Sequence, residues 1–363
     1  MSVNTGLSAV SDHLLMVAVV VYSLALLAYA GDFAYGRRAR AAVKPVAQPV
    51  SELAGVGARG ADEPAAGTGE AGDGPAGPAT GETPVSAETP AGGGSDGISP
   101  GGLEKGRQAR GPLIRAAIGL TFLGAALHLT GVITRGIAVD RVPWGDMYEF
   151  VTALTCVTVL FFIAVMLKYR AWHLGLFVMA AVVVALGLAQ TVIYTPAGPL
   201  VPALKSYWLA IHVAAMTLST GIFFVAAVLG VVYLFAERHG RQVAAGREPA
   251  DHGVFRRLPG PEALDRLCYR TVVFGFPVWT FGIICGAIWA DQAWGRYWGW
   301  DPVETWAFIT WVVYACFLHA RATAGWRGKR AAWIQIIGFA CLLFNVLVVQ
   351  TDVTGLHSYA GLS

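Results

Sequence analysis

The sequence is short of charge and lacks cysteine motifs. Only 13% of its 363 residues are charged and 55% are hydrophobic, a balance that excludes a soluble globular domain. Its five cysteines form no CxxC pair, which excludes a disulfide framework and a thiol-redox motif. No Walker motif is present, so the chain cannot by itself power transport by ATP hydrolysis. Any thiol chemistry must therefore use the thiols of another molecule.

Residues 41–110 contain no aromatic residue and are rich in Ala, Gly and Pro. Such a segment cannot bury enough apolar surface to fold alone, so we expect a disordered linker on the inner side of the membrane. The predicted organisation is then a first transmembrane span in residues 1–36, the linker at 37–110, and a seven-helix core at 111–363.

Eight apolar runs are each able to cross about 30 Å of hydrocarbon as a helix. They predict an all-α, polytopic membrane protein with about eight transmembrane helices. The runs cover residues 13–30, 113–133, 148–167, 174–194, 207–236, 271–290, 305–320 and 331–351.

Basic residues define the orientation of these spans. An outside N-terminus places four segments and both termini on the outer face, and only four of the 26 Lys and Arg residues fall there. Basic residues concentrate on the cytoplasmic side of membrane proteins, so the distribution predicts N- and C-termini outside. The outer segments are 135–147, 195–206, 291–304 and 352–363.

The tryptophan-rich segment, residues 289–306, contains five tryptophans and Tyr297 between two membrane-length runs. Its end predicts a helix start: Asp301 can cap free backbone N–H groups, Pro302 suits the first helical position, and Glu304 lies three residues after the cap. The alternative interpretation is an interfacial aromatic belt, which needs only one or two such residues per helix end. The density of rings favours a binding surface for a flat, apolar ligand.

Two histidines are expected at the same membrane face as the tryptophan-rich segment. His212 lies near the outer end of the fifth span, and His357 lies in the outer C-terminal segment. Two neutral imidazoles beside an aromatic surface are what a bis-His haem requires. Taken singly, each could instead be a hydrogen-bonded residue at a helix end.

His319 lies about 25 Å into its span, near the inner end, and an ionisable residue at membrane depth is a functional candidate. It could ligate a second haem, although the chain offers it no obvious mate. His128, in the second span, is expected to pack or to form a hydrogen bond rather than to bind a ligand.

These motifs resemble a known family. The pattern WGxxWGWDPxETWxxxTW at 294–311 resembles the WWD signature of haem-handling proteins, and His212, His319 and His357, the last within LHSYxG, match the CcsA/ResC family of System II cytochrome c maturation. Its members are labelled CcsB in some actinobacteria. The stretch from Pro143 to Glu149 is similar to the family's Pro-x-x-Asn-x-Tyr-Glu element, with Asp146 in place of Asn. The resemblance covers residues 113–363.

The resemblance implies a function. Family members receive haem b from the inner side, present it outside, and promote thioether bonds between its vinyl groups and the CxxCH cysteines of an apocytochrome c. By this resemblance the chain is a holocytochrome c synthase component of the bacterial plasma membrane, active on the outer face with a ResB-type partner subunit. A thioredoxin-like thiol reductant would act indirectly, and no nucleic-acid partner is expected.

The resemblance also implies roles for residues. His212 and His357 would hold the outer haem, and His319 would hold an inner haem with a second histidine from the partner. The cofactor-binding candidates include Trp294, Trp298, Trp300 and Trp306. Asp301 is a catalytic candidate together with Trp298, Trp300 and Trp306, although helix capping is the expected role of Asp301 and Glu304, with a propionate-side or proton-transfer role as the alternative.

Two other functions compete with this interpretation. The chain could be a haem exporter or channel subunit without synthase activity, which would form no thioether bond to a supplied CxxCH peptide. It could also be a dihaem electron-transfer membrane protein, although such proteins usually pair histidines on two helices that span both haems.

Overall fold

The computed structural model describes residues 3–35, 111–198, 204–246, 259–323 and 325–357 of the chain. Within these ranges the protein is helical and contains no strand, and eight helices are long and apolar enough to cross a membrane. The predicted all-α, multi-pass architecture is thereby confirmed. The linker expected at 37–110 lies outside the described residues.

The helices extend beyond the apolar runs that predict them. The fifth run ends at residue 236, whereas its helix continues for two more turns, because helical hydrogen bonding does not stop where hydropathy falls. The elements are α1 (Thr5–Tyr35), α4 (Pro112–Val139), α5 (Met147–Tyr169), the short 3₁₀ turn η1 (Trp172–Leu174), α6 (Gly175–Thr191), α7 (Tyr207–Ala244), α8 (Pro261–Trp294), α9 (Pro302–Ala322), α10 (Lys329–Phe344), the π-helical η4 (Asn345–Val349) and α11 (Gln350–Asp352).

Side-chain caps define where three helices begin at one end of the bundle. The Asp146 carboxylate accepts from the Glu149 N–H at the start of α5, and the Ser206 hydroxyl accepts from the Trp208 N–H at the start of α7. The α9 cap is the predicted capping box. The Asp301 side chain accepts from the Glu304 backbone N–H, and the Glu304 side chain accepts from the Asp301 backbone N–H.

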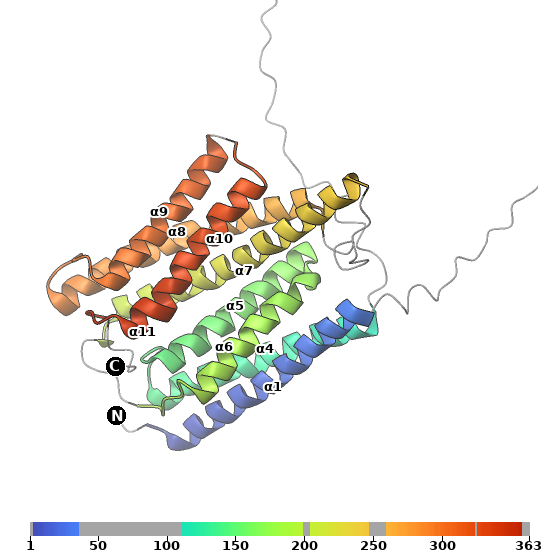
Figure 1. The fold of residues 1–363 in the computed structure, drawn as a ribbon. Helices are drawn as coiled ribbons and strands as arrows, with labels where there is room; N and C mark the ends of the chain where they lie inside the picture. The colour runs from blue at the N-terminus through green and yellow to red at the C-terminus, as the bar shows by residue number, and fades with distance from the viewer. Residues whose placement is uncertain (1–2, 36–110, 199–203, 247–258, 324, 358–363) are drawn as a thin grey trace, which may run out of the picture.

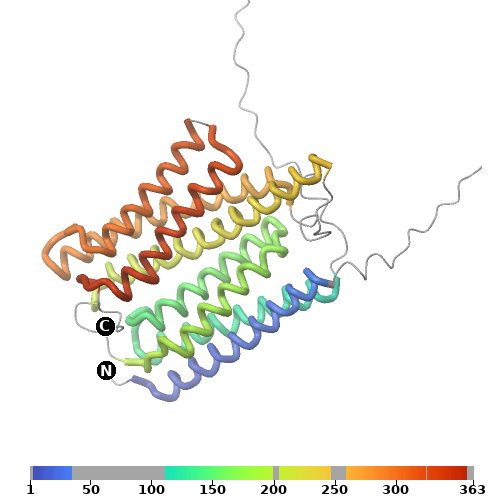
Figure 2. The backbone as a smooth tube through the Cα atoms, viewed as in Figure 1, coloured from blue at the N-terminus to red at the C-terminus, as the bar shows by residue number. Residues whose placement is uncertain are grey.

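The helices form two adjoining groups, visible as the blue-to-green and yellow-to-red halves of Figures 1 and 2. In the first group α1 packs along α4 and α6, and in the second α7 packs along α8 and α10, with α9 beside α10. The two groups meet where α5 packs on α7. Buried aromatic rings occupy the second group, including Phe223 stacked on Tyr314 with centroids 3.9 Å apart.

The segments predicted to share one face lie at one end of the bundle. The start of α1, the short α11, the turn between α4 and α5, and the connection between α8 and α9 are found there (Figure 1). The placement of that end outside the membrane stays a prediction. The same end contains the candidate site.

Candidate functional site

A cavity lies between the two helix groups at this end. Its volume is about 200 Å³, and its wall is mainly apolar. The turn before α5 supplies Trp144 and Asp146, and the second group supplies His212, Trp298 and His357. Two of the predicted site histidines thus face one cavity, although 145 positions of sequence separate them.

His212 is held in a groove on α8. Its Nδ1 lies 2.7 Å from the carbonyl oxygen of Gly282, 70 residues away in sequence. A Cβ at Gly286 would lie 2.6 Å from both Nδ1 and Cε1 of the ring, so the absence of a side chain there makes room for the imidazole. Because a carbonyl can only accept, the ring donates from Nδ1 and keeps its lone pair on Nε2.

His357 is held by a carboxylate. Its Nδ1 lies 2.8 Å from Asp301 Oδ2, and its ring is edge-on to Trp289 and Trp294 at centroid distances of 6.1 and 5.1 Å. As with His212, the acceptor fixes the proton on Nδ1 and leaves the Nε2 lone pair for a metal. Histidines that bind metals commonly use their second nitrogen in this way.

Asp301 does more than cap α9. Its Oδ1 also accepts from the backbone N–H of Leu356 at 2.8 Å, and its Oδ2 accepts from the Val303 N–H at 3.4 Å. Burial by itself would raise the pKa of this carboxyl, but the hydrogen bonds from His357, Leu356 and Val303 together lower the pKa below its ordinary value. The sequence predicted the cap and missed the pairing with His357, for which no local pattern gives a signal.

The tryptophans are divided between the cavity and its surroundings. Trp289 and Trp298 line the cavity, and Trp294 contacts His357. Trp300 is 64% exposed and lies edge-on to Trp298, with centroids 5.7 Å apart. Trp306 packs against Phe344 instead, at 4.4 Å. Trp289 was not among the predicted cofactor-binding residues, although it begins the same aromatic segment.

The other two candidate histidines lie away from the cavity. His319 is exposed in the last turn of α9, whereas the cavity adjoins the first turns of that helix. His128 is fully buried, with Nε2 3.0 Å from the Thr152 carbonyl oxygen and Nδ1 3.4 Å from the Tyr22 hydroxyl. The hydrogen-bonded role expected for His128 is confirmed.

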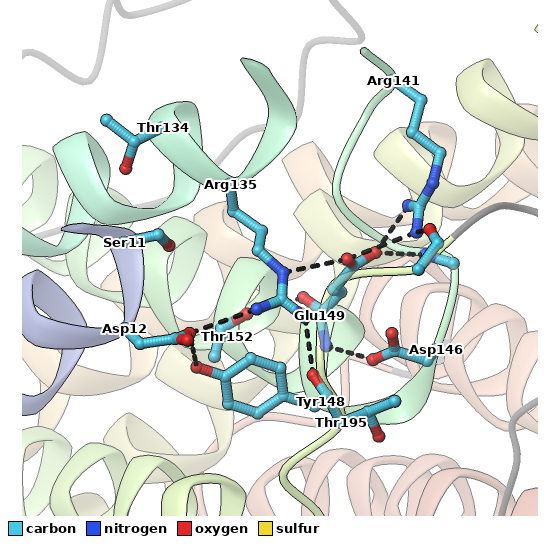
Figure 3. Close-up of polar contacts among 12 residues, drawn as sticks. Ser11, Asp12, Thr134, Arg135, Arg141, Asp146, Tyr148, Glu149, Thr152 and Thr195 are labelled. Atoms are coloured by element: carbon cyan, nitrogen blue, oxygen red, sulfur yellow. Dashed lines mark hydrogen bonds and ion pairs between the residues drawn. The ribbon is translucent and has the colours of Figure 1, made fainter. Parts of the chain in front are cut away.

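A buried charged network stands behind one wall of the cavity (Figure 3). Glu149 accepts from Arg135 Nε at 3.1 Å, from Arg141 Nη1 at 2.6 Å and from the Gly145 N–H at 2.8 Å. Arg135 also contacts Asp12 of α1 at 3.1 Å. We call these four side chains the Glu149 network: Asp12, Arg135, Arg141 and Glu149. It was not predicted from the sequence, which indicated only a family element at 143–149.

Asp146 lies between the network and the cavity. Burial, followed by the nearby Glu149, raises the pKa of its carboxyl to about 6. The carboxylate caps α5 by accepting from the Glu149 N–H at 2.9 Å, and it also lines the cavity. Ionisation of this acid therefore costs more than it does in water.

Comparisons with known proteins show which family the chain resembles. The model of the family "Cytochrome C assembly protein" matches residues 144–357. The cytochrome c biogenesis protein CcsA of Guillardia theta is 38% identical over 257 residues, covering 66% of this chain and 84% of that protein. CcsA of Gloeobacter violaceus is 36% identical over 289 residues, covering 66% and 85%. The solved structure of cytochrome c haem lyase CcmF aligns at 19% identity with a TM-score of 0.47, over 68% of this chain and 44% of that chain.

Proposed function

The chain belongs to the cytochrome c assembly protein family, and on that premise we propose that it holds haem b for covalent attachment to an apocytochrome c. It is a multi-pass membrane protein of cytochrome c maturation. The observation that carries the proposal is the convergence of His212 and His357 on one aromatic cavity, each with Nδ1 hydrogen-bonded and Nε2 available as a ligand.

The donor set fits a haem. Bis-imidazole ligation needs two neutral rings with one free nitrogen each, and both acceptors fix that tautomer. A porphyrin also needs flat apolar walls, which Trp289 and Trp298 provide. Asn345, at the start of η4, lines the same cavity, and its Oδ1 is buried without a hydrogen-bond partner. Such an atom is suited to a polar group of a bound molecule.

The residues of the site would orient the cofactor and keep it shielded. Bound haem supplies two vinyl groups, to which the CxxCH thiols of an apocytochrome c add as thioethers. His212 and His357 would hold the iron, and Trp298, which lines the same cavity, would contact the porphyrin. Trp300, exposed beside Trp298, is placed to contact a docking apocytochrome rather than the interior of the cavity.

Transfer across the membrane completes the proposal. His319 lies at the far end of α9 and is exposed on the bundle, as a ligand shared with another subunit must be. We propose that it holds an inner haem together with a histidine of a ResB-type partner, and that haem then passes to the His212–His357 site on the outer face of a bacterial plasma membrane.

Absorption spectra test the outer site. Wild-type protein, co-expressed with the partner and purified in detergent, should show low-spin bis-His haem b, and His212→Ala and His357→Ala should each lose part of that signal. The matched control is His13→Ala, an exposed histidine of α1 that does not line the cavity. Spectra of the double variant identical to wild type would show that the pairing is wrong.

A peptide assay separates synthesis from export. The purified complex should join haem to a reduced CxxCH peptide through thioether bonds, and haem that is bound but never joined would indicate an export subunit. A dihaem electron-transfer protein is less well supported, because such a protein needs a second histidine pair, and His319 lies in the last turn of α9, away from the cavity that His212 and His357 line.

A further inference from the structure

The Asp301 carboxylate joins two segments that are 55 residues apart. On one side it accepts from Val303 at the start of α9, and on the other it accepts from the Leu356 N–H and from His357 Nδ1. The side chain is 4% exposed, so these bonds form away from competing water. One buried acceptor thus ties the segment after α11 to the tryptophan-rich segment.

The absence of a side chain at Gly355 allows this contact. A Cβ at this position would lie 2.7 Å from Asp301 Oδ1, closer than a side-chain carbon can approach an oxygen without displacement. Any larger residue would therefore push the carboxylate away from Leu356 and His357. The close approach is a property of the backbone at 355 and does not depend on capping of α9.

The two cavity histidines differ in what holds them. His212 is part of α7 and lies in a groove of α8, so two packed helices fix its ring. His357 follows the last helical residue, Asp352, by five positions and lies in a turn. Its placement therefore depends on side-chain contacts, and the polar contact among them is the hydrogen bond to Asp301.

We propose that Asp301 is the positioning residue for His357. By accepting from Nδ1 it selects the tautomer with a free Nε2, and by accepting from Leu356 it holds the segment that presents the ring to the cavity. This inference rests on the proposed function, since it takes His357 as an axial ligand of haem.

Asp301→Asn is the discriminating variant. Asparagine caps helices as well as aspartate does and has nearly the same shape, so α9 should be unaffected. Its single oxygen cannot serve all three donors, and an amide NH₂ facing Nδ1 forces the imidazole proton onto Nε2, where it blocks ligation. Loss of such a partner typically weakens metal binding by about 10–100-fold.

The spectrum of the haem-loaded complex is the first readout. Asp301→Asn should lose the same part of the low-spin signal as His357→Ala, and added imidazole should restore it in both. The matched control is Ser206→Ala, which removes the cap of α7 at the same end of the bundle and should keep the wild-type spectrum. A wild-type spectrum for Asp301→Asn beside a changed His357→Ala would overturn the inference and leave the proposed function standing.

An unchanged His357→Ala spectrum would instead show that the proposed ligand pair is wrong, and this inference would fail with it. The second readout needs no haem. Amide hydrogen exchange of residues 353–357 in haem-free protein should be faster in Gly355→Ala than in wild type and unchanged in Ser206→Ala. Because Gly355→Ala keeps the carboxylate and the α9 cap, it tests the contact even where Asp301→Asn folds poorly. Equal exchange rates in Gly355→Ala and wild type would overturn the inference that Asp301 holds this segment.

Discussion

At one end of the bundle, the Glu149 network and the His212–His357 cavity use their polar groups in opposite ways. In the network the charges are paired: Glu149 accepts from two arginines and a backbone N–H, and its side chain is fully buried, although Arg141 Nε is buried without a hydrogen-bond partner. In the cavity each imidazole forms a hydrogen bond through Nδ1, and its Nε2 is left as a possible ligand. The paired charges of the network stabilise the fold, whereas the free imidazole nitrogens of the cavity can bind a metal.

The comparison shows how a site for a large cofactor can be built in a membrane. Unmatched polar groups are costly in an apolar environment, so the charges of the first helix group are satisfied internally. The network then holds Trp144 and Asp146 as one wall through the Glu149–Gly145 bond. The opposite wall holds each ligand imidazole through its Nδ1 alone, by the Gly282 carbonyl for His212 and by the Asp301 carboxylate for His357.

Glu149→Gln should produce the largest change in stability. It removes the buried charge between Arg135 and Arg141, and breaking such a pair costs about 3–5 kcal/mol. Thermal unfolding of the detergent-purified variant measures the loss. A melting temperature equal to that of wild type would show that the Glu149 network does not stabilise the fold.

Gly286→Ala should act on the cavity with little effect on stability. The new methyl group meets the His212 ring and displaces it from the Gly282 carbonyl, so haem retention should fall by about 10-fold or more. Haem content per protein and the low-spin signal measure this. Gly187→Ala in α6 is the control, because a Cβ there meets nothing within 4 Å. Equal haem loss in both variants would exclude a specific role for the groove.

Asp146→Asn should have the smallest effect, and its sign depends on pH. The pKa of Asp146 is raised to about 6 from 3.8, so between these values the folded protein holds the proton that the unfolded chain has lost. Asp146 therefore makes stability fall as pH rises through that window. Asparagine keeps the α5 cap and removes the contribution of this residue to the pH dependence of stability.

Melting temperatures at pH 4 and pH 7 check this prediction. The difference between them should change in the Asn variant, with the variant as stable as wild type or more stable at pH 7. A variant less stable than wild type at pH 7 would show that the ionised carboxylate contributes a favourable contact. Asp146 would then belong with the matched charges of the network rather than with the cavity.

Much of the fold follows from local sequence. Hydropathy over about twenty residues is enough to predict a membrane helix, because each span must bury its own backbone polar groups in hydrocarbon. The α9 start was also predictable, since the capping box needs only Asp301 and Glu304, three positions apart. The linker and the orientation in the membrane remain predictions.

The site was predicted only in part. His212 and His357 were identified by their positions in the topology and by a family resemblance, and the structure places both on one cavity. Trp300 and Trp306 were grouped with Trp298, but spacing along a Gly-containing segment does not define which rings turn inward. Trp300 has a positive φ of 58°, and the residue is 64% exposed although its ring contacts Trp298.

By itself, the sequence determined the eight spans, the helix caps and the supply of imidazoles and indoles at one end, because these depend on residues within a few turns of one another. Tertiary structure alone decided that Asp301 meets His357, that His212 meets Gly282, and that Glu149 gathers two arginines. The first two contacts join residues 56 and 70 positions apart, which the return of the chain after α11 and the packing of α7 on α8 bring within hydrogen-bonding distance, whereas the third depends on the packing of α4 on α5 and on the turn between them.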